Sequence, residues 1–258
     1  MSPSGPVSIS AARGLPGLRL VVLAGLPSPW SQAAKAILRV KRLDYTLVQR
    51  APDDPPSALE AWTGQASFPA ALYESERPRS GWAEILLLAE RLAPEPALVP
   101  TEPSLRALCF GVCHELCGEM GLGWCRRLET VAAGLRRTPP DPIAEWLGGK
   151  YGYSPETAAQ APGRVREILA LLGELLAESR ARGGRHLLGA ELSALDLYWA
   201  TFCNLVSPLP SDLLPMPEPL RPMFTSPDPA VHELLAKSGL LELRDRVYRE
   251  QLELPVVL

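Results

Sequence analysis

The chain has 258 residues, of which 47% are hydrophobic and 21% charged, the composition of a soluble globular protein. A net charge of −3 and an aromatic content of 6% supply neither the basic surface nor the stacking rings that nucleic acids require. No apolar run reaches the length of about 20 residues needed to span a membrane, and the first residues lack the apolar core of a secretion signal. We therefore expect a cytoplasmic protein without nucleic-acid or membrane partners, whose five cysteines are reduced thiols.

The first third of the chain alternates between strand and helix patterns. Residues 1–17 have no periodic pattern, so we expect them to be a disordered lead-in to a domain at 18–93. A strand, a helix and a strand in succession imply a parallel pair joined by a right-handed crossover. The expected elements, in chain order, are a strand at 18–26, a helix at 29–40, strands at 44–50 and 68–75, and a helix at 82–92.

A proline-rich linker at 94–104 separates this domain from a second one at 105–258, in which no strand pattern occurs. We expect the second domain to be all-helical. Its expected elements are a helix at 105–135 with a break near Gly121, a loop at 136–163, helices at 165–181 and 191–205, and a helical segment near the end of the chain.

Four local features carry a resemblance to a known family. Ser-Pro-Trp-Ser at 28–31 opens the first helix, Phe68-Pro69 opens the third strand, "AEILLLAERL" forms the next helix, and "HLLGAELSALDLYWA" lies at 186–200. Their order and spacing resemble the cytosolic glutathione transferases of the serine type. The resemblance implies an α/β thioredoxin-like N-terminal domain followed by an all-α helical C-terminal domain. It also implies glutathione as co-substrate, no metal, a small apolar electrophile as second substrate, and a homodimer.

Ser28 is open to two interpretations. Serine before a proline at the first helical position is favoured chemistry for capping a helix, and this role needs no ligand. The helix start also carries a partial positive charge that favours a thiolate. The resemblance implies that the Ser28 hydroxyl donates to the sulfur of glutathione, with Ser31 as the second candidate for this catalytic role.

The remaining glutathione contacts are implied by the same resemblance. Phe68 would offer main-chain groups to the cysteinyl part of glutathione, in front of a cis Pro69. Ser80 and Gly81 in one register, or Gly81 and Trp82 in another, match the start of the helix that holds the γ-glutamyl end, where the family has an acidic residue or glutamine followed by serine. This chain has no acid at that point, although Glu84 follows one turn later.

Other candidates are interpreted structurally. Ser193 and Asp196 form the pattern of a capping box. Cys109, Cys113 and Cys117 recur every four residues, a row too long for one tetrahedral zinc ion, and we expect them to be buried small hydrophobes. The aromatic stretch Trp124, Trp146, Tyr151 and Tyr153 is interpreted either as an electrophile pocket or as core packing.

Two functional hypotheses follow. The first is an enzyme that transfers the glutathione thiolate to a small apolar electrophile, with Ser28 stabilising the thiolate. The second is a protein of the same fold that has lost glutathione affinity and serves in binding or assembly. The retained Ser28 favours the first, and the missing acid near Ser80 favours the second.

Overall fold

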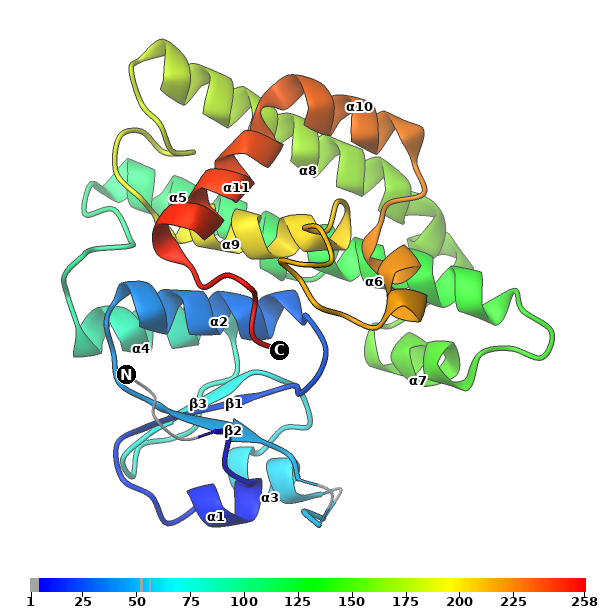
Figure 1. Cartoon of the computed structure of the whole chain (residues 1–258). Coiled ribbons are helices and arrows are strands. Elements are labelled where there is room, and N and C mark those ends of the chain that lie inside the picture. Colours follow the sequence, from blue (N-terminus) through cyan, green and yellow to red (C-terminus); the bar gives the residue numbers. More distant parts are fainter. Residues whose placement is uncertain (1–4, 52, 56) are drawn as a thin grey trace.

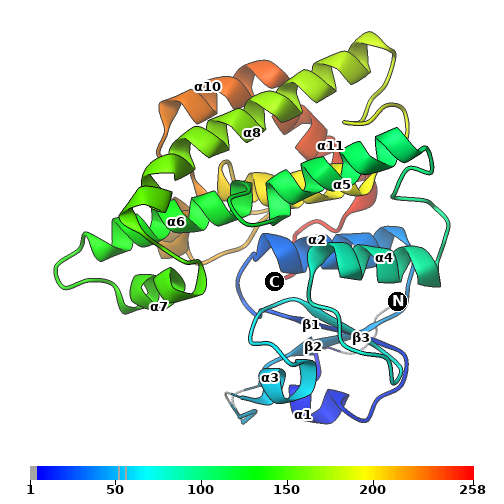
Figure 2. The ribbon, with the colours of Figure 1, turned by 180° about the vertical axis from the view of Figure 1, so that it is seen from behind.

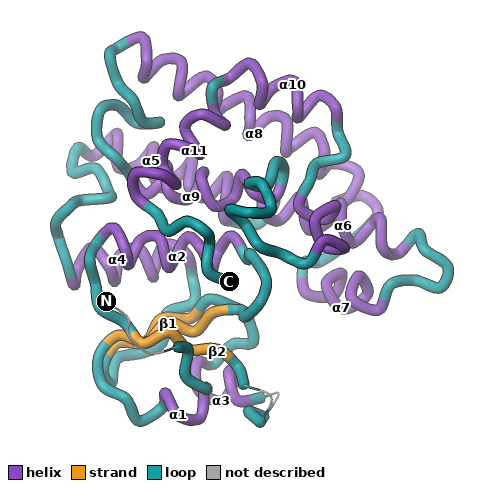
Figure 3. The backbone as a smooth tube through the Cα atoms, in the orientation of Figure 1, coloured by secondary structure: helices purple, strands orange, loops and turns teal. Residues whose placement is uncertain are grey.

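The structure is a computed structural model that describes residues 5–51, 53–55 and 57–258. A small sheet with helices on both faces forms one part of the molecule, and a larger all-helical part lies against the helices of one face (Figures 1 and 2). Strands occur only in the first part of the described chain, and helices make up most of the remainder (Figure 3). This is the α/β domain followed by an all-α domain that the sequence predicts.

The sheet contains a parallel and an antiparallel pair. Its strands are β1 (Leu18–Val22), β2 (Thr46–Gln49) and β3 (Ala70–Tyr73), in the order β2-β1-β3. Leu20 of the central strand lies opposite Leu47 in the parallel pair and opposite Ala71 in the antiparallel pair. The expected β-α-β crossover is confirmed, with all five residues of β1 buried.

Helices cover both faces of this sheet. The upper face in Figure 1 carries α2 (Pro29–Val40) and α4 (Trp82–Leu92), and the lower face carries α1 (Ile9–Ala12) and α3 (Ala58–Thr63). Since side chains alternate along a strand, Leu20 joins the core shared with α2, α4 and the helical domain, whereas Val21 joins a smaller core with α1 and α3.

The expected disordered lead-in is wrong for residues 5–17, and residues 1–4 lie outside the described residues. Ile9 is fully buried, and Val7 extends the sheet by pairing with Val48. The Asp54 carboxylate accepts hydrogen bonds from the N–H groups of Ile9 at 2.9 Å and Ser10 at 3.0 Å. The segment is ordered by a partner 45 residues away, which no local pattern in a four-residue helix reveals.

The second part is built from seven α-helices and two short 3-10 helices in the described chain. They are α5 (Pro103–Cys117), α6 (Leu122–Leu135), α7 (Pro142–Lys150), α8 (Pro155–Ala181), α9 (Ala194–Phe202), η1 (Cys203–Leu205), η2 (Glu218–Phe224), α10 (Pro229–Ser238) and α11 (Leu240–Gln251). All nine residues of α9 are buried, so this helix is the centre of the helical domain. No described helix is both long enough and apolar enough to cross a membrane.

The loop expected at 136–163 is wrong, because it contains α7 and the first turns of α8. Both helices begin with a proline, at Pro142 and Pro155, and proline at the first helical position starts a helix without losing a backbone hydrogen bond. The side chains of Asp141 and Ser154 cap these two starts. The break expected near Gly121 is confirmed as the turn between α5 and α6.

Candidate functional site

The strand-to-helix turn places Ser28 at the N-cap of α2, with Pro29 at the first helical position. Ser28 has φ −60° and ψ 118°, and only 9% of its surface is exposed. Its side chain accepts no hydrogen bond from the helix, so the expected capping contact is absent although the position is right. The Ser28 hydroxyl therefore makes no bond to the helix that it precedes, and Ser28 is buried.

Ser31 lies deeper than Ser28. Only 1% of its surface is exposed, and its hydroxyl accepts a hydrogen bond from the N–H of Leu23 at 3.5 Å. This contact ties the turn after β1 to the first turn of α2. Ser31 is engaged with the backbone, and Ser28 is the more accessible of the two candidates.

The Phe68–Pro69 peptide bond is cis, as the resemblance predicts, and the two residues line different hollows. Phe68 borders the larger hollow, of about 320 Å³, at the carboxyl ends of β1 and β2. Pro69 borders a smaller one of about 10 Å³ at the start of α4. The large hollow is lined by Val22, Leu23, Ala24, Arg50, Ala51 and Phe68, and the small hollow by Trp30, Ala34, Pro69, Ser80, Trp82, Ile85 and Tyr198.

Ser80 and Gly81 lie at the start of α4, because Gly81 is its N-cap and Trp82 its first helical residue. Ser80 is exposed and borders the small hollow. Glu84 accepts a hydrogen bond from the Gly81 N–H at 3.2 Å and from the Arg77 guanidinium at 2.9 Å. The bond from Arg77 is the main reason why the pKa of Glu84 is lowered, so the acid nearest to this helix start already has a cationic partner.

Aromatic side chains join the start of α4 to the helical domain. The Tyr198 hydroxyl donates to the Trp82 carbonyl at 3.0 Å, and the two rings pack edge to face with centroids 5.6 Å apart.

The two hollows differ in what they can hold. A volume of about 10 Å³, that of the small hollow, holds about one water molecule. The small hollow therefore takes no more than a small group in this conformation, whereas the large hollow has the size of a ligand site.

Trp30, the second residue of α2, joins the start of this helix to α6. Its indole N–H donates to the Cys117 carbonyl at 3.0 Å, and its ring packs edge to face on Phe202 at 5.0 Å. A Cβ atom on Gly123 would lie 2.8 Å from the Trp30 ring and 2.6 Å from Phe202. Glycine is thus required at 123 for the close approach of the two helices.

The chain matches no protein-family model and no curated protein. Solved structures match nearly its whole length. A glutathione S-transferase domain-containing protein from Marinobacter aquaeolei VT8 has a TM-score of 0.61 at 15% identity, over 90% of this chain and 98% of that chain. The chain has the glutathione transferase fold. A glutathione S-transferase from Methylobacterium radiotolerans JCM 2831, solved with glutathione sulfonate, has a TM-score of 0.56 at 18% identity, over 90% of this chain and 91% of that chain. Glutathione transferase Omega 3C from Trametes versicolor has a TM-score of 0.52 at 17% identity, over 93% of this chain and 96% of that chain.

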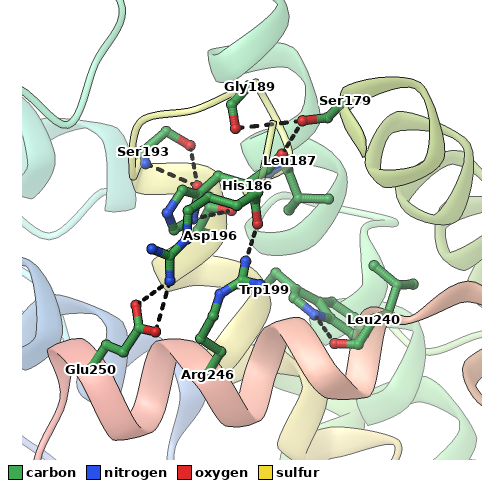
Figure 4. Close-up of polar contacts among 11 residues, drawn as sticks. Ser179, His186, Leu187, Gly189, Ser193, Asp196, Trp199, Leu240, Arg246 and Glu250 are labelled. Carbon is green, nitrogen blue, oxygen red and sulfur yellow. Dashed lines mark hydrogen bonds and ion pairs between the residues drawn. The ribbon is translucent and has the colours of Figure 1, made fainter. Parts of the chain in front are cut away.

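Within the glutathione transferase fold, the buried acid of the helical domain has a structural role. Asp196 is fully buried and accepts from the N–H groups of Leu187 and Ser193, each at 2.9 Å, and from the Ser193 hydroxyl at 2.7 Å (Figure 4). The Ser193 hydroxyl donates to the carboxylate, so only one half of the expected reciprocal box forms. The Nδ1 atom of His186 lies 3.5 Å from the same carboxylate.

The cysteine row of α5 lies in the core of this fold. Cys109, Cys113 and Cys117 are each at most 4% exposed, and burial raises the pKa of Cys113 and Cys117 well above the ordinary thiol value. A bond from Cys113 instead lowers the pKa of Cys109. Throughout the described ranges, no group of three or more His, Cys, Asp or Glu residues is arranged to hold a metal ion.

The aromatic stretch of the helical domain is divided between packing and exposure. Trp124 packs edge to face on Tyr151 at 4.9 Å and donates its indole N–H to the Tyr151 carbonyl at 3.0 Å. Trp146 is 64% exposed on α7. Trp124 therefore belongs to the core packing, whereas Trp146 faces outward.

Sequence reasoning missed the residues that border the large hollow apart from Phe68. Leu23 and Ala24 follow β1, and Arg50 and Ala51 follow β2. Ligands bind at the carboxyl ends of parallel strands in α/β sheets, so the predicted β-α-β start already contained the signal.

Proposed function

We propose that this protein binds glutathione across the Phe68–Pro69 peptide and transfers its thiolate to a small apolar electrophile. The observations that carry the proposal are the large hollow beside Phe68, at the carboxyl ends of β1 and β2, and the N-cap serine of α2, whose hydroxyl makes no capping hydrogen bond. Support comes from the glutathione transferase fold and from the glutathione sulfonate in the Methylobacterium radiotolerans structure. Glutathione acts as co-substrate, and the proposal involves no metal.

The chemistry uses the helix start of α2. A thiol has an ordinary pKa of about 8.5, so only a small fraction is ionised at neutral pH. The Ser28 hydroxyl donates a hydrogen bond to the sulfur, and the partial positive charge of the helix N-terminus adds to its effect. The thiol proton passes to solvent, the sulfur forms a bond to the electrophilic carbon, and the electron pair leaves with the displaced group or is protonated after addition.

Glutathione binding is divided between the two hollows in this proposal. The main-chain groups of Phe68 pair with the cysteinyl part, and Arg50 at the rim of the large hollow attracts the glycyl carboxylate. Ser80 and Gly81 at the start of α4 face the γ-glutamyl end, in front of Pro69. Since Glu84 is held by Arg77, no free acid lies near this helix start among the described residues, and we expect glutathione affinity to be lower by about one to two decades.

A second candidate function is supported by the small hollow. With a volume of about 10 Å³ between Pro69, Ser80 and Trp82, it has no room for a γ-glutamyl group unless side chains move. A protein of this fold that has lost glutathione affinity would serve in binding or assembly. Glutathione affinity distinguishes the two functions.

We propose a homodimer for either function. Leu87 on α4 and Leu108 on α5 are 42% and 40% exposed, and both helices lie on the same side of the molecule in Figure 2. Large exposed apolar residues on adjoining helices favour a protein contact. The five cysteines are all unpaired and buried, which fits the reducing cytoplasm in which we place the protein.

The test is calorimetric titration with glutathione, combined with a conjugation assay using a small aryl halide. We expect the wild type to bind and conjugate, and Ser28→Ala to keep glutathione affinity while losing conjugation by about ten- to a hundredfold. Ser57→Ala is the matched control, because Ser57 is also an N-cap serine without a capping hydrogen bond. Absence of both binding and conjugation in the wild type would contradict the enzyme and favour the second candidate.

A further inference from the structure

Two cations of the helical domain lie against aromatic rings and have no carboxylate partner among the residues that the structure describes. The Arg127 guanidinium is 5.5 Å from the Phe224 ring, and the Lys150 ammonium is 5.5 Å from Trp146 and 5.9 Å from Tyr151. Desolvation lowers the pKa of Arg127 and also that of Lys150, which is exposed overall, and the charge of Arg127 lowers the pKa of Lys150 further. Among the described residues, the Tyr151 hydroxyl accepts a hydrogen bond from Arg127 and favours its charged form, but no carboxylate contributes to the pKa of either cation.

The partners of Arg127 differ from those of neighbouring arginines. Arg126, one residue earlier on α6, is 3% exposed and pairs with Glu129 while donating to two backbone carbonyls. Arg164 on α8 lies between two glutamates. An arginine that is partly withdrawn from water is ordinarily compensated in this way. Arg127 is partly buried, and its partner among the described residues is the Tyr151 hydroxyl instead of a carboxylate.

Helix α6 connects the position of Arg127 to the candidate active site at the start of α2. Gly123 on α6 contacts the Trp30 ring, which follows Ser28 and Pro29 at the start of α2. Arg127 comes four residues after Gly123, on the same face of α6 and about 6 Å further along its axis. Arg127 thus lies on the helical-domain side of the helix start that carries Ser28, and Lys150 lies near enough for the charge of Arg127 to act on it.

We propose that Arg127 and Lys150 form an anion subsite for a flat aromatic or otherwise apolar molecule that carries one carboxylate or an equivalent anionic group. A guanidinium binds a carboxylate through two parallel hydrogen bonds, and poor solvation strengthens them. The rings of Tyr151 and Trp146 beside Lys150 offer faces for the apolar body. That this molecule is the acceptor of the thiolate rests on the proposed function, whereas the subsite itself does not.

The test compares 2-naphthoate with its neutral counterpart 2-naphthamide, titrated into the full chain by calorimetry without glutathione. We expect the wild type to prefer the anion by about tenfold or more, because the amide forgoes the charge-assisted bonds. Arg127→Gln and Lys150→Gln should each remove most of this preference while leaving naphthamide affinity unchanged. Arg106→Gln is the matched control, since Arg106 lies 5.0 Å from the Phe110 ring on α5, away from the subsite. Its preference should equal that of the wild type.

Circular dichroism verifies that each variant is folded, and Lys150→Gln, at an exposed position, carries the test if Arg127→Gln is unfolded. Equal affinities for the two compounds, no binding of either, or an equal loss in Arg106→Gln would overturn the subsite. Because glutathione is absent from these titrations, a failure of glutathione binding leaves the subsite standing. Loss of the naphthoate preference, in turn, leaves the glutathione site standing.

Discussion

Replacing Asp196 with asparagine tests how the helical domain is held together. The carboxylate at the start of α9 accepts three hydrogen bonds in a fully buried position, from the Leu187 N–H, the Ser193 N–H and the Ser193 hydroxyl. Asparagine has nearly the same shape but only one acceptor oxygen. Oriented for the two Ser193 donors, its NH₂ group faces the Leu187 N–H, and two donors then meet without an acceptor.

The expected loss in free energy of unfolding follows from these contacts. One hydrogen bond to a charged acceptor is lost, at about 1.5–3 kcal/mol, and two others change from charge-assisted to neutral, at about 1 kcal/mol each. Removing a buried charge returns part of this loss. We expect Asp196→Asn to lower the free energy of unfolding by about 2–4 kcal/mol. For a chain of this size, that corresponds to a fall in Tm of about 5–15 °C.

Urea unfolding followed by circular dichroism measures the change. Asp141→Asn is the matched control, because Asp141 is also the first acid of a helix but caps α7 in a partly exposed position. It should cost less than about 1 kcal/mol. A loss below about 1 kcal/mol in Asp196→Asn, or equal losses in the two variants, would refute the role given to the buried carboxylate.

Three further outcomes are expected. Gly123→Ala should destabilise the protein by about 1–3 kcal/mol in urea unfolding, because its Cβ meets Trp30 and Phe202, whereas Gly111→Ala on α5, with open space around it, should be neutral or stabilising. Burial opposes ionisation of Asp54, but the Ser10 hydroxyl and three backbone N–H groups hold its pKa well below the ordinary value. Asp54→Asn should therefore lower the free energy of unfolding most above about pH 5. Its difference from wild type should become smaller as the pH falls through about 4, where the carboxyl of the unfolded chain is protonated. Native protein should react slowly with a thiol reagent at neutral pH, since all five cysteines are buried and burial raises the pKa of Cys125 and Cys203 to about 12.

Each of these outcomes has a contrary result. Equal stabilities of Gly123→Ala and Gly111→Ala would show that α6 and α2 separate without loss. If the difference in free energy of unfolding between wild type and Asp54→Asn is independent of pH, the hydrogen bonds at this carboxylate do not favour its ionised form. Rapid labelling of one or more thiols in the absence of urea would show an open path into the core.

Patterns within a few residues of one another predicted much of the fold. The apolar spacing at 29–40 places α2 within its observed bounds, and the Phe68–Pro69 bond is cis as expected. Local patterns failed where a partner lies far along the chain, as with α1, whose N–H groups bond to Asp54. They also failed at α7, where the proline that starts the helix was interpreted as part of a loop.

The sequence predicted where the residues of the candidate site lie in the fold better than it predicted which hydrogen bonds they make. The sequence places Ser28 at a helix start, but whether its hydroxyl caps the helix depends on side-chain orientation, and no capping bond forms. Similarly, Glu84 is visible in the sequence as the nearest acid to Ser80, but its engagement by Arg77 depends on how the turn before α4 folds back. Contacts of this kind follow from the tertiary structure.

The central claim is that the helix start at Ser28 ionises the thiol of bound glutathione. Titrating the ultraviolet absorbance of the thiolate in the glutathione complex measures the pKa of this thiol directly. We predict a pKa lowered by about one to two units from the ordinary value of about 8.5 in the wild type, restored toward that value in Ser28→Ala and unaffected in Ser57→Ala. A bound thiol with the same pKa in wild type and Ser28→Ala would contradict the claim.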